Sequence, residues 1–260
     1  MTDDEVKQSV VTDIIHLKEL GIMPVIVHGG GRAIKELLDE AGLQSEFVGG
    51  HRKTDAVTMR YVEMALTGRV NSELVRLING GGLMAVGLSG KDGGMVTARK
   101  RLHRFLADGK EQETDLGFVG DVEEIDTGLI RHLIRADYVP VISPVATGRD
   151  LNDYNINADM FAGHMAGALG ASSYIALTDV DGLMRDKDDP STLVHEISLE
   201  QAEAEIGGMI QGGMIPKIES CIIALRKGVQ SAHIVNGMAK HSILKALLAE
   251  ERPGTMIKRG

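Results

Sequence analysis

The stretch Pro24-Val25-Ile26-Val27-His28-Gly29-Gly30-Gly31 joins a short β-branched run to three consecutive glycines. Such a run is typical of a strand that is buried on both faces of a parallel sheet. A helical pattern resumes at Arg32 and continues to Ala41, so the glycines lie at a strand-to-helix junction. Glycine N–H groups and a helix N-terminus favour negative charge. The stretch therefore predicts an α/β fold, with either an anion site or a plain packing turn at the glycines.

Strands and helices alternate along the rest of the chain. Further buried strands are expected at 84–88, 139–142, 174–178 and 232–235. Helices are expected at 4–20, 32–41, 57–68, 72–79, 128–136, 159–169, 199–206, 215–227 and 242–249. Residues 116–122 alternate apolar and small side chains, which predicts a β excursion such as a hairpin. This order predicts a mainly parallel sheet covered by helices on both faces.

The polar, turn-forming stretch Thr147-Gly148-Arg149-Asp150 places a lobe boundary near 144–153. The two predicted lobes are residues 1–146 and residues 147–260. No Ser- or Pro-rich linker separates them, so we expect two closely associated lobes rather than independent domains.

Composition restricts the functional class. A net charge of -9 over 260 residues argues against binding to nucleic acids or anionic membranes, since either needs a clustered basic surface. No apolar run approaches the roughly 20 residues of a membrane span, and the acidic start Met1–Glu5 has no signal-peptide core. The single cysteine, Cys221, lies in an apolar helical pattern, and the histidines show no metal-ligand spacing. We therefore expect a cytoplasmic protein without a protein-held metal or a thiol nucleophile.

Two well-known nucleotide motifs do not fit. In a G-x-G-x-x-G fingerprint the third glycine would fall on Ile34. In a P-loop, Ala85 would occupy the first glycine position, and Asp92 would stand where Ser or Thr follows the lysine. A dinucleotide-dependent oxidoreductase is therefore a distant alternative.

Four polar positions are candidates for chemistry, and each has a plainer alternative. Arg52 could bind a carboxylate through two hydrogen bonds, or it could be a solvated surface arginine. Asn157 or Asp159 could bind a ligand, or cap the following helix. Lys217 begins a helix, where a cation opposes the helix dipole, so it indicates either function or an ordinary surface lysine. The stretch 178–182 follows a buried strand, where open sheets bind nucleotides, or is an ordinary turn.

Six blocks, taken together and in order, closely resemble the amino-acid kinase family, in particular its members that phosphorylate N-acetyl-L-glutamate. The blocks are His28–Gly31, Gly50–Asp55, Gly87–Gly93, Tyr154–Asp159, Leu177–Val180 and Gly212–Lys217. Residues 253–257 also resemble the closing strand of that family. Because the blocks cover nearly the whole chain, the resemblance favours the functional alternative at each candidate position.

The resemblance implies a three-layer αβα sandwich around an open, mainly parallel sheet. It implies that residues 1–146 hold N-acetyl-L-glutamate and form the dimer contact, and that residues 147–260 hold ATP. The implied reaction transfers the γ-phosphoryl group of ATP to the γ-carboxylate, a step in arginine biosynthesis. Magnesium would arrive with ATP, held mainly by phosphates and water. A homodimer or larger homo-oligomer is expected.

The resemblance also implies roles for individual residues. Gly30 and Gly31 would donate backbone hydrogen bonds to the substrate carboxylate and the transferring phosphoryl group, and Arg52 would hold the α-carboxylate. Asn155 would bind the backbone-like groups of the substrate. Lys217 would neutralise charge on the ATP phosphates, and Asp159 would orient the catalytic lysines. The residues expected to line the adenine and ribose site are Asp179, Val180, Asp181, Gly182, Leu183, Met184, Met209 and Ile210.

The family further implies a Lys-x-Gly-Gly strand just before the helix that begins near Asp4, and the printed sequence has no such stretch. Its lysine would face the phosphoryl group opposite Lys217, and losing it would cost on the order of a hundred- to thousand-fold in rate. We also expect an unfilled position in the sheet. Because the other motifs are intact, a start-site difference or a truncation is a better explanation than an evolved loss.

Two alternatives remain within this family. One is a kinase that acts on a carrier-bound acidic amino acid, although the 51–55 and 154–159 blocks favour the free acetylated substrate. The other is a catalytically silent homologue that serves as a binding or regulatory module, for which the absent lysine is the argument.

Overall fold

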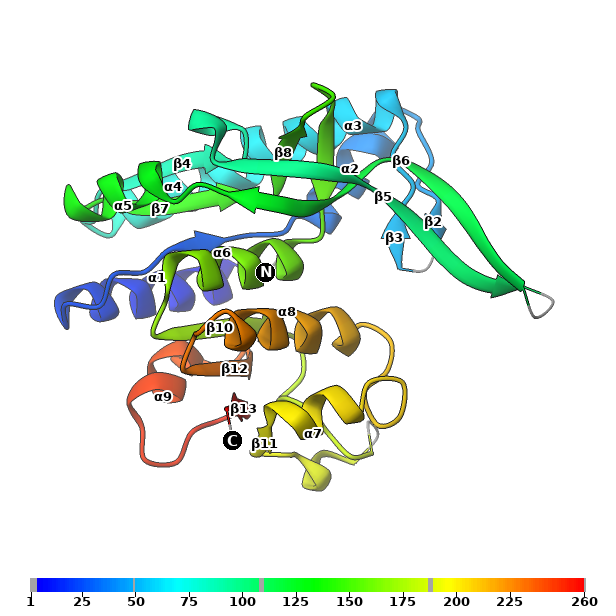
Figure 1. Cartoon of the computed structure of the whole chain (residues 1–260). Coiled ribbons are helices and arrows are strands. Elements are labelled where there is room, and N and C mark those ends of the chain that lie inside the picture. Colours follow the sequence, from blue (N-terminus) through cyan, green and yellow to red (C-terminus); the bar gives the residue numbers. More distant parts are fainter. Residues whose placement is uncertain (1–3, 49, 108–109, 187–188, 260) are drawn as a thin grey trace. The chain divides into compact units, whose positions relative to one another are not determined.

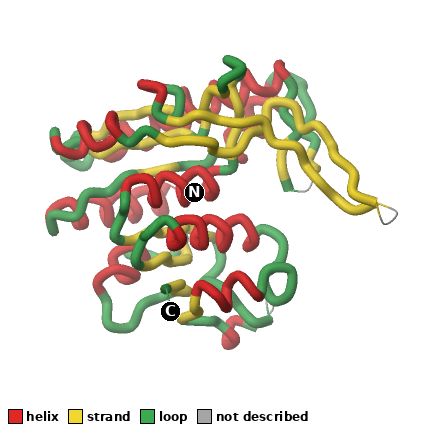
Figure 2. Tube along the Cα trace, viewed as in Figure 1, coloured by secondary structure: helices red, strands yellow, loops and turns green. Residues whose placement is uncertain are grey.

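Strands and helices alternate through much of the chain. Figure 2 shows the helices in red and the strands in yellow. The structure, a computed structural model, describes residues 4–48, 50–107, 110–186 and 189–259. Residues 1–3, the start of the acidic N-terminal segment, lie outside the described residues. The chain forms two compact units, and the predicted α/β class is confirmed. Unit 1 contains residues 1–24, 77–84 and 162–260, and unit 2 contains residues 25–76 and 85–161.

Unit 2 is built on a parallel sheet of three strands in the order β1 (Ile26–Val27), β7 (Val139–Ser143), β4 (Ala85–Ser89). All five residues of the central strand β7 are buried. This matches the apolar runs from which the strands were predicted. The helices that begin in this unit are α2 (Gly31–Glu40), α3 (Ala56–Glu63), α4 (Asn71–Gly80), α5 (Gly128–Arg135) and α6 (Ala158–Leu169).

Unit 2 also contains a closed barrel that was not predicted. Its strands are β5 (Val96–Ala107), β6 (Lys110–Ile125), β9 (Asp153–Ile156) and β8 (Val145–Gly148). The β excursion predicted at 116–122 is only the middle of β6, which forms a long antiparallel hairpin with β5 (Figure 1). The stretch near 144–153, predicted as a lobe boundary, instead contains β8 and the first residue of β9. The apolar residues of these two strands, Val145, Ala146, Tyr154 and Ile156, are buried. The functional division into lobes 1–146 and 147–260 stays a prediction.

The helix predicted at 57–68 changes its hydrogen bonding partway along. It is α-helical in α3 and then forms a π-helix, η1 (Met64–Val70), which leads directly into α4. π-Helical turns are rare and are frequent at functional sites. Leu66 of this segment packs in a core cluster with Ile34 and Leu38 of α2. The segment therefore lies against the helix that begins at the glycine loop.

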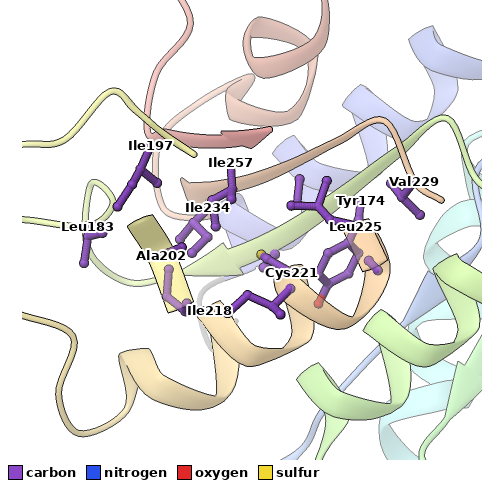
Figure 3. Packing of buried hydrophobic residues seen from close by; sticks show 14 of the residues in the cluster. Tyr174, Leu183, Ile197, Ala202, Ile218, Cys221, Leu225, Val229, Ile234 and Ile257 are labelled. Carbon is purple, nitrogen blue, oxygen red and sulfur yellow. The ribbon is translucent and has the colours of Figure 1, made fainter. Parts of the chain in front are cut away.

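Unit 1 is built on a mixed sheet in the order β10 (Ser173–Thr178), β12 (Ser231–Asn236), β13 (Thr255–Lys258), β11 (Glu196–Ser198). Pairs β10–β12 and β11–β13 are parallel, whereas β12 and β13 are antiparallel. The helices α7 (Leu199–Ala204), α8 (Met214–Arg226) and α9 (Ser242–Leu248) pack against these strands. Figure 3 shows side chains of the sheet and of α8 meeting in one core. The expected strands and helices here are confirmed, and the short strand β11 was not predicted.

Helix α1 (Asp4–Glu19) is joined to α9 by a buried carboxylate. Asp13 is 1% exposed, and its oxygens accept hydrogen bonds from the backbone N–H groups of Ile243 (3.2 Å) and Leu244 (3.4 Å). The ring of His241 lies 2.8 Å from the same carboxylate. Asp13 therefore satisfies the otherwise unpaired N–H groups at the start of α9.

The described residues include no helix with the length and hydropathy of a membrane span.

Candidate active site

The glycine loop connects β1 to α2, and its three glycines differ in the space around them. Gly30 caps α2, and a Cβ atom there would lie 2.6 Å from Cδ2 of Leu66 and 3.2 Å from Cγ2 of Val70. A Cβ atom on Gly31 would meet no described atom within 4 Å. A side chain at position 30 would thus have to displace Leu66, whereas the space at 31 is open. The loop can present its backbone to a ligand at the N-terminus of α2.

A second helix begins beside the same loop. A Cβ atom on Gly29 would lie 3.6 Å from Cβ of Ala158, the first residue of α6. Asn157 caps this helix, because its Oδ1 accepts the N–H of Met160 at 3.1 Å. Of the two capping alternatives, the one at Asn157 is therefore confirmed, and Asp159 lies in the first turn. The N-termini of α2 and α6 both favour an anion at this loop.

Arg52 is brought to the glycine loop by a short hairpin. The strands β2 (Phe47–Val48) and β3 (His51–Arg52) pair antiparallel. The side chain of Arg52 donates from Nη2 to the carbonyl of Gly31 at 3.2 Å and from Nη1 to Oγ of Ser45, and its Cζ lies 4.6 Å from the ring centre of Phe47. Arg52 is 8% exposed, so it is not a solvated surface arginine. Burial lowers its pKa, yet a guanidinium stays charged at neutral pH.

The position of Arg52 is fixed by β6. The backbone N–H of Thr54 donates to Leu116 at 2.8 Å, and the carbonyl of Thr54 accepts the N–H of Phe118 at 2.6 Å. The buried hydroxyl of Thr54 donates to the carbonyl of Arg52 at 2.8 Å. The strand that carries the arginine is therefore held from the barrel side.

Asn155 lies on β9 and is half-buried, opposite Val145 of β8 and Val119 of β6. Asp153, two residues earlier on the same strand, accepts hydrogen bonds from Lys91 Nζ (2.9 Å) and from Thr147 Oγ1 (2.6 Å). Lys91 also pairs with Glu63 at 2.5 Å. Burial opposes the charge of Lys91, but these two carboxylates outweigh it and raise its pKa. Lys91 is thus an ion-pairing residue beside the strand of Asn155.

His28 and Asn71 form a buried pair that the sequence did not indicate. Nε2 of His28 and Nδ2 of Asn71 are 3.0 Å apart, and Nδ1 of His28 is 3.0 Å from the carbonyl oxygen of Gly29. Burial lowers the pKa of His28. The sequence offered little reason to expect a buried role for Asn71, because an asparagine just before a predicted helix is typical of an ordinary helix cap.

In unit 1 the structure brings Lys217 to the carboxyl end of β10. Lys217 lies in the first turn of α8, and its Nζ donates to the carbonyl of Leu177 at 3.1 Å. Leu177 comes just before Thr178 and Asp179, so the lysine and the predicted nucleotide segment are neighbours. The carbonyl partially offsets the unfavourable helix dipole at this position.

The residues predicted to line the ATP site separate into two groups. Asp179, Val180 and Asp181 are exposed, and Oδ1 of Asp181 accepts a hydrogen bond from Asn236, the last residue of β12, at 2.8 Å. Leu183 and Ile210 are buried in the core of unit 1, so their side chains are not exposed to a ligand. Met184 and Met209 are half-buried.

Gly182 explains how the exposed turn connects to this core. It has a φ of +149°, and a Cβ atom would lie 2.7 Å from Oγ1 of Thr255. The same hydroxyl accepts the N–H of Leu183 at 2.8 Å. A glycine is needed here because β13 approaches the backbone closely.

The structure thus gathers Gly30, Gly31, Arg52 and the start of α6 in unit 2, and Lys217 with Asp179–Asp181 in unit 1. The roles assigned to these residues stay predictions. Within the described part of the chain, no group of three His, Cys, Asp or Glu side chains is arranged to hold a metal ion.

Comparisons with known proteins identify the family of the chain. The sequence model of the amino acid kinase family matches residues 1–236. Acetylglutamate kinase from Heliobacterium modesticaldum is 46% identical over 259 residues, which are 99% of this chain and 88% of that protein. Acetylglutamate kinase from Methanococcus aeolicus is 45% identical over 260 residues, which are 100% of this chain and 88% of that protein.

Solved structures share the fold. The protein smu.665 from Streptococcus mutans has a TM-score of 0.77 at 27% identity, covering 96% of this chain and 91% of that chain. N-acetylglutamate synthase from Neisseria gonorrhoeae has a TM-score of 0.81 at 25% identity, covering 99% of this chain and 57% of that chain. Carbamate kinase from Giardia lamblia, at 16% identity and a TM-score of 0.70, shows the fold alone. The chain therefore belongs to the amino acid kinase family, in the branch that contains the acetylglutamate kinases.

Proposed function

We propose that this protein transfers the γ-phosphoryl group of ATP to the γ-carboxylate of N-acetyl-L-glutamate, a step of arginine biosynthesis. The observation that carries the proposal is the buried Arg52, which donates to the carbonyl of Gly31 beside the N-termini of α2 and α6. The relatives at 45–46% identity bear the name acetylglutamate kinase, which supports the choice of substrate.

The substrate part of the reaction is assigned to unit 2. N-acetyl-L-glutamate carries two carboxylates, and one fixed guanidinium with backbone N–H donors suits such a molecule. Arg52 would hold the α-carboxylate, Asn155 would bind the acetylated backbone, and the N–H groups of Gly30 and Gly31 would face the reacting end. Asp159, in the first turn of α6, stays predicted to orient catalytic lysines.

The nucleotide part is assigned to unit 1. ATP would bind at the carboxyl ends of β10 and β12, which is where open sheets bind nucleotides. Lys217 would neutralise charge on the phosphates, and the exposed segment Asp179–Asp181 would contact the nucleoside. We propose that magnesium arrives with ATP and is held mainly by phosphate oxygens and water.

The chemical step needs no base from the protein. A carboxylate is ionised at neutral pH, so its oxygen attacks the γ-phosphorus directly. A new O–P bond forms, the bond from phosphorus to the bridging oxygen breaks, and ADP leaves with the electron pair. The products are an acyl phosphate and ADP. The protein contributes positioning and charge neutralisation, as in other phosphoryl transfers.

The test is an assay of ADP release coupled to hydroxylamine, which traps acyl phosphates. We expect ADP and hydroxamate to form with N-acetyl-L-glutamate and not with N-acetyl-L-aspartate, whose carboxylate is one carbon shorter. Equal rates with both compounds, or ADP without hydroxamate, would contradict the assigned reaction. Activity only with a carrier-bound acidic amino acid would establish the alternative kinase.

Lys217→Ala tests the nucleotide side. Removing a cation that acts on developing charge lowers kcat by about a hundred-fold or more and changes KM for N-acetyl-L-glutamate little. Lys227→Ala, at the other end of α8, is the control and keeps its kcat. A Lys217→Ala variant with unchanged turnover would refute the role of this lysine.

Three further expectations stay predictions: assembly into a homodimer or larger oligomer, a cytoplasmic location, and the roles of Met184 and Met209 in the nucleotide site.

A further inference from the structure

The buried pair His28 and Asn71 connects the glycine loop to the three-stranded sheet of unit 2. Asn71 is 3% exposed and His28 is 8% exposed. Nδ2 of Asn71 donates to the carbonyl of Val141 on β7 at 2.9 Å and lies 3.3 Å from the carbonyl of Leu88 on β4. The same nitrogen faces Nε2 of His28 at 3.0 Å. One amide group therefore links His28, which directly follows β1, to Leu88 near the end of β4 and to Val141 in the middle of β7.

The partners of His28 determine where its proton resides. The carbonyl oxygen of Gly29 can only accept, so Nδ1, at 3.0 Å, carries the hydrogen. Nε2 is then the acceptor for the amide of Asn71. This arrangement requires a neutral ring, because a protonated Nε2 would point a hydrogen at an N–H₂ group. Burial of the ring lowers its pKa and favours the neutral form.

The orientation of the Asn71 amide is fixed as well. Reversing it would place Oδ1 against the carbonyl oxygens of Val141 and Leu88, which are themselves acceptors. A Cβ atom at position 87 would lie 2.0 Å from Oδ1 of Asn71, so Gly87 provides the space that the amide occupies. Asn71 therefore has one orientation, and it presents a donor to His28.

We infer that His28 and Asn71 are positioning residues that aim the N–H of Gly30 at the reacting groups. All described peptide bonds are trans, so the carbonyl of Gly29 and the N–H of Gly30 point in opposite directions from one peptide plane. By holding that carbonyl, His28 sets the direction of the N–H. This inference rests on the proposed function, which assigns the Gly30 N–H to the substrate carboxylate and phosphoryl group.

Two substitutions at His28 separate positioning from simple packing. In His28→Asn, the side-chain amide lies near the place of Nδ1 and can still donate to Gly29. In His28→Gln, the amide reaches the place of Nε2, so it keeps a contact with Asn71 and has no donor near Gly29. Glutamine also fills the buried space better than asparagine. A packing role therefore favours His28→Gln, and a positioning role favours His28→Asn.

The experiment compares kcat, KM and melting temperature for the wild type, both variants and His132→Gln, a control at an exposed histidine of α5. We expect kcat of His28→Gln to fall by about ten- to a hundred-fold and to lie well below that of His28→Asn, with KM for ATP unchanged in both. The control stays at the wild-type kcat. A kcat for His28→Gln equal to or above that of His28→Asn overturns the inference.

A second measurement works on the wild type and needs no activity. ¹⁵N NMR of histidine-labelled protein distinguishes a ring protonated on Nδ1 from one protonated on Nε2. We expect the Nδ1–H form for His28, and loss of that single form in Asn71→Leu. An Nε2–H form in the wild type refutes the positioning role of His28 and leaves the proposed function untouched. If the ring has the Nδ1–H form but the protein releases no ADP in the presence of N-acetyl-L-glutamate, the proposed function is refuted and the hydrogen bonding of His28 stands.

Discussion

Replacing Gly117 by alanine tests how the barrel holds Arg52, the residue that we propose binds the substrate. Gly117 has a φ of +77°, and a Cβ atom there would lie 2.2 Å from the carbonyl oxygen of Thr54. Ordinary contact begins at 3.4 Å, so the two backbones must separate by about 1.2 Å. Thr54 cannot yield freely, since its N–H and carbonyl both bond to β6. The displacement should therefore reach Arg52, whose carbonyl accepts the hydroxyl of Thr54.

Two energies add in the Gly117→Ala variant. A left-handed backbone costs alanine about 1–2 kcal/mol, and overpacking costs about 1–3 kcal/mol. We expect the free energy of unfolding to fall by about 2–5 kcal/mol. A misplacement near 1 Å can cost about a hundred-fold in rate, so kcat/KM for N-acetyl-L-glutamate should fall by that order. KM for ATP should not change, because the nucleotide is assigned to unit 1.

Urea unfolding and steady-state kinetics measure the two effects, and Gly42→Ala is the matched control. Gly42 has a φ of +71°, and a Cβ atom there would meet no described atom within 4 Å. The Gly42→Ala control measures only the cost of placing alanine in a left-handed backbone. We expect its free energy of unfolding to fall by about 1–2 kcal/mol and its kinetics to stay unchanged. Equal stability losses in the two variants, with KM for N-acetyl-L-glutamate unchanged in both, would refute the reasoning.

Three further predictions concern single side chains. Arg52→Lys raises KM for N-acetyl-L-glutamate by about ten-fold or more and leaves KM for ATP unchanged. The reason is that a lysine cannot donate to both Gly31 and Ser45 and also stack on Phe47. An unchanged KM for N-acetyl-L-glutamate would contradict the substrate-binding role of Arg52. Asp13→Ala lowers the free energy of unfolding, measured in urea, by about 2–4 kcal/mol, since the N–H groups of Ile243 and Leu244 lose a buried acceptor. The control Ser9→Ala removes only one weaker acceptor, that of the His241 N–H, and lowers it by about 1 kcal/mol. Burial, with the nearby charge of Arg252, lowers the pKa of His233 from 6.5 to about 4. As the pH falls, His233 is therefore protonated in the unfolded chain before it is protonated in the folded chain. About 3 kcal/mol of stability that is present above pH 6.5 is lost as the pH falls toward 4. His233→Phe should lack this component in melts between pH 7.5 and 4.5, and identical pH profiles would count against it.

Much of the fold could be predicted because it depends on local pattern. The buried runs at 139–142 and 174–178 became β7 and β10, and Asp4 began α1 as expected. The barrel could not be predicted in the same way. Strand β5 carries the consecutive charges Arg99, Lys100 and Arg101, which give no apolar alternation. Its hairpin partner β6 follows it directly, but its second partner, β8, pairs through Thr97 and Thr147, which lie 50 residues apart. Pairing of that kind is decided by tertiary contacts rather than by propensity.

The candidate site shows the same limit. The glycine loop and Lys217 stood out by residue type and position. Arg52 was connected to the glycine loop only through the family resemblance, since its contact with Gly31 depends on the short β2–β3 hairpin. The pair His28 and Asn71 is 43 residues apart in the chain. Neither periodicity nor a local motif connects such positions. The π-helix at Met64–Val70 was also hidden, because helical patterns do not distinguish it from an α-helix.

The contact between Asp13 and the start of α9 has a consequence for how the chain folds as it is made. The carboxylate and its partners are separated by 228 to 231 residues. At about 5–20 residues per second, α1 leaves the ribosome on the order of ten seconds or more before α9 exists. During that interval a charge that later becomes buried must remain in water, and the apolar face of α1 has no final partner. Synthesis speed and chaperone binding should therefore affect the yield of unit 1 more than that of unit 2, which is complete once residue 161 has emerged.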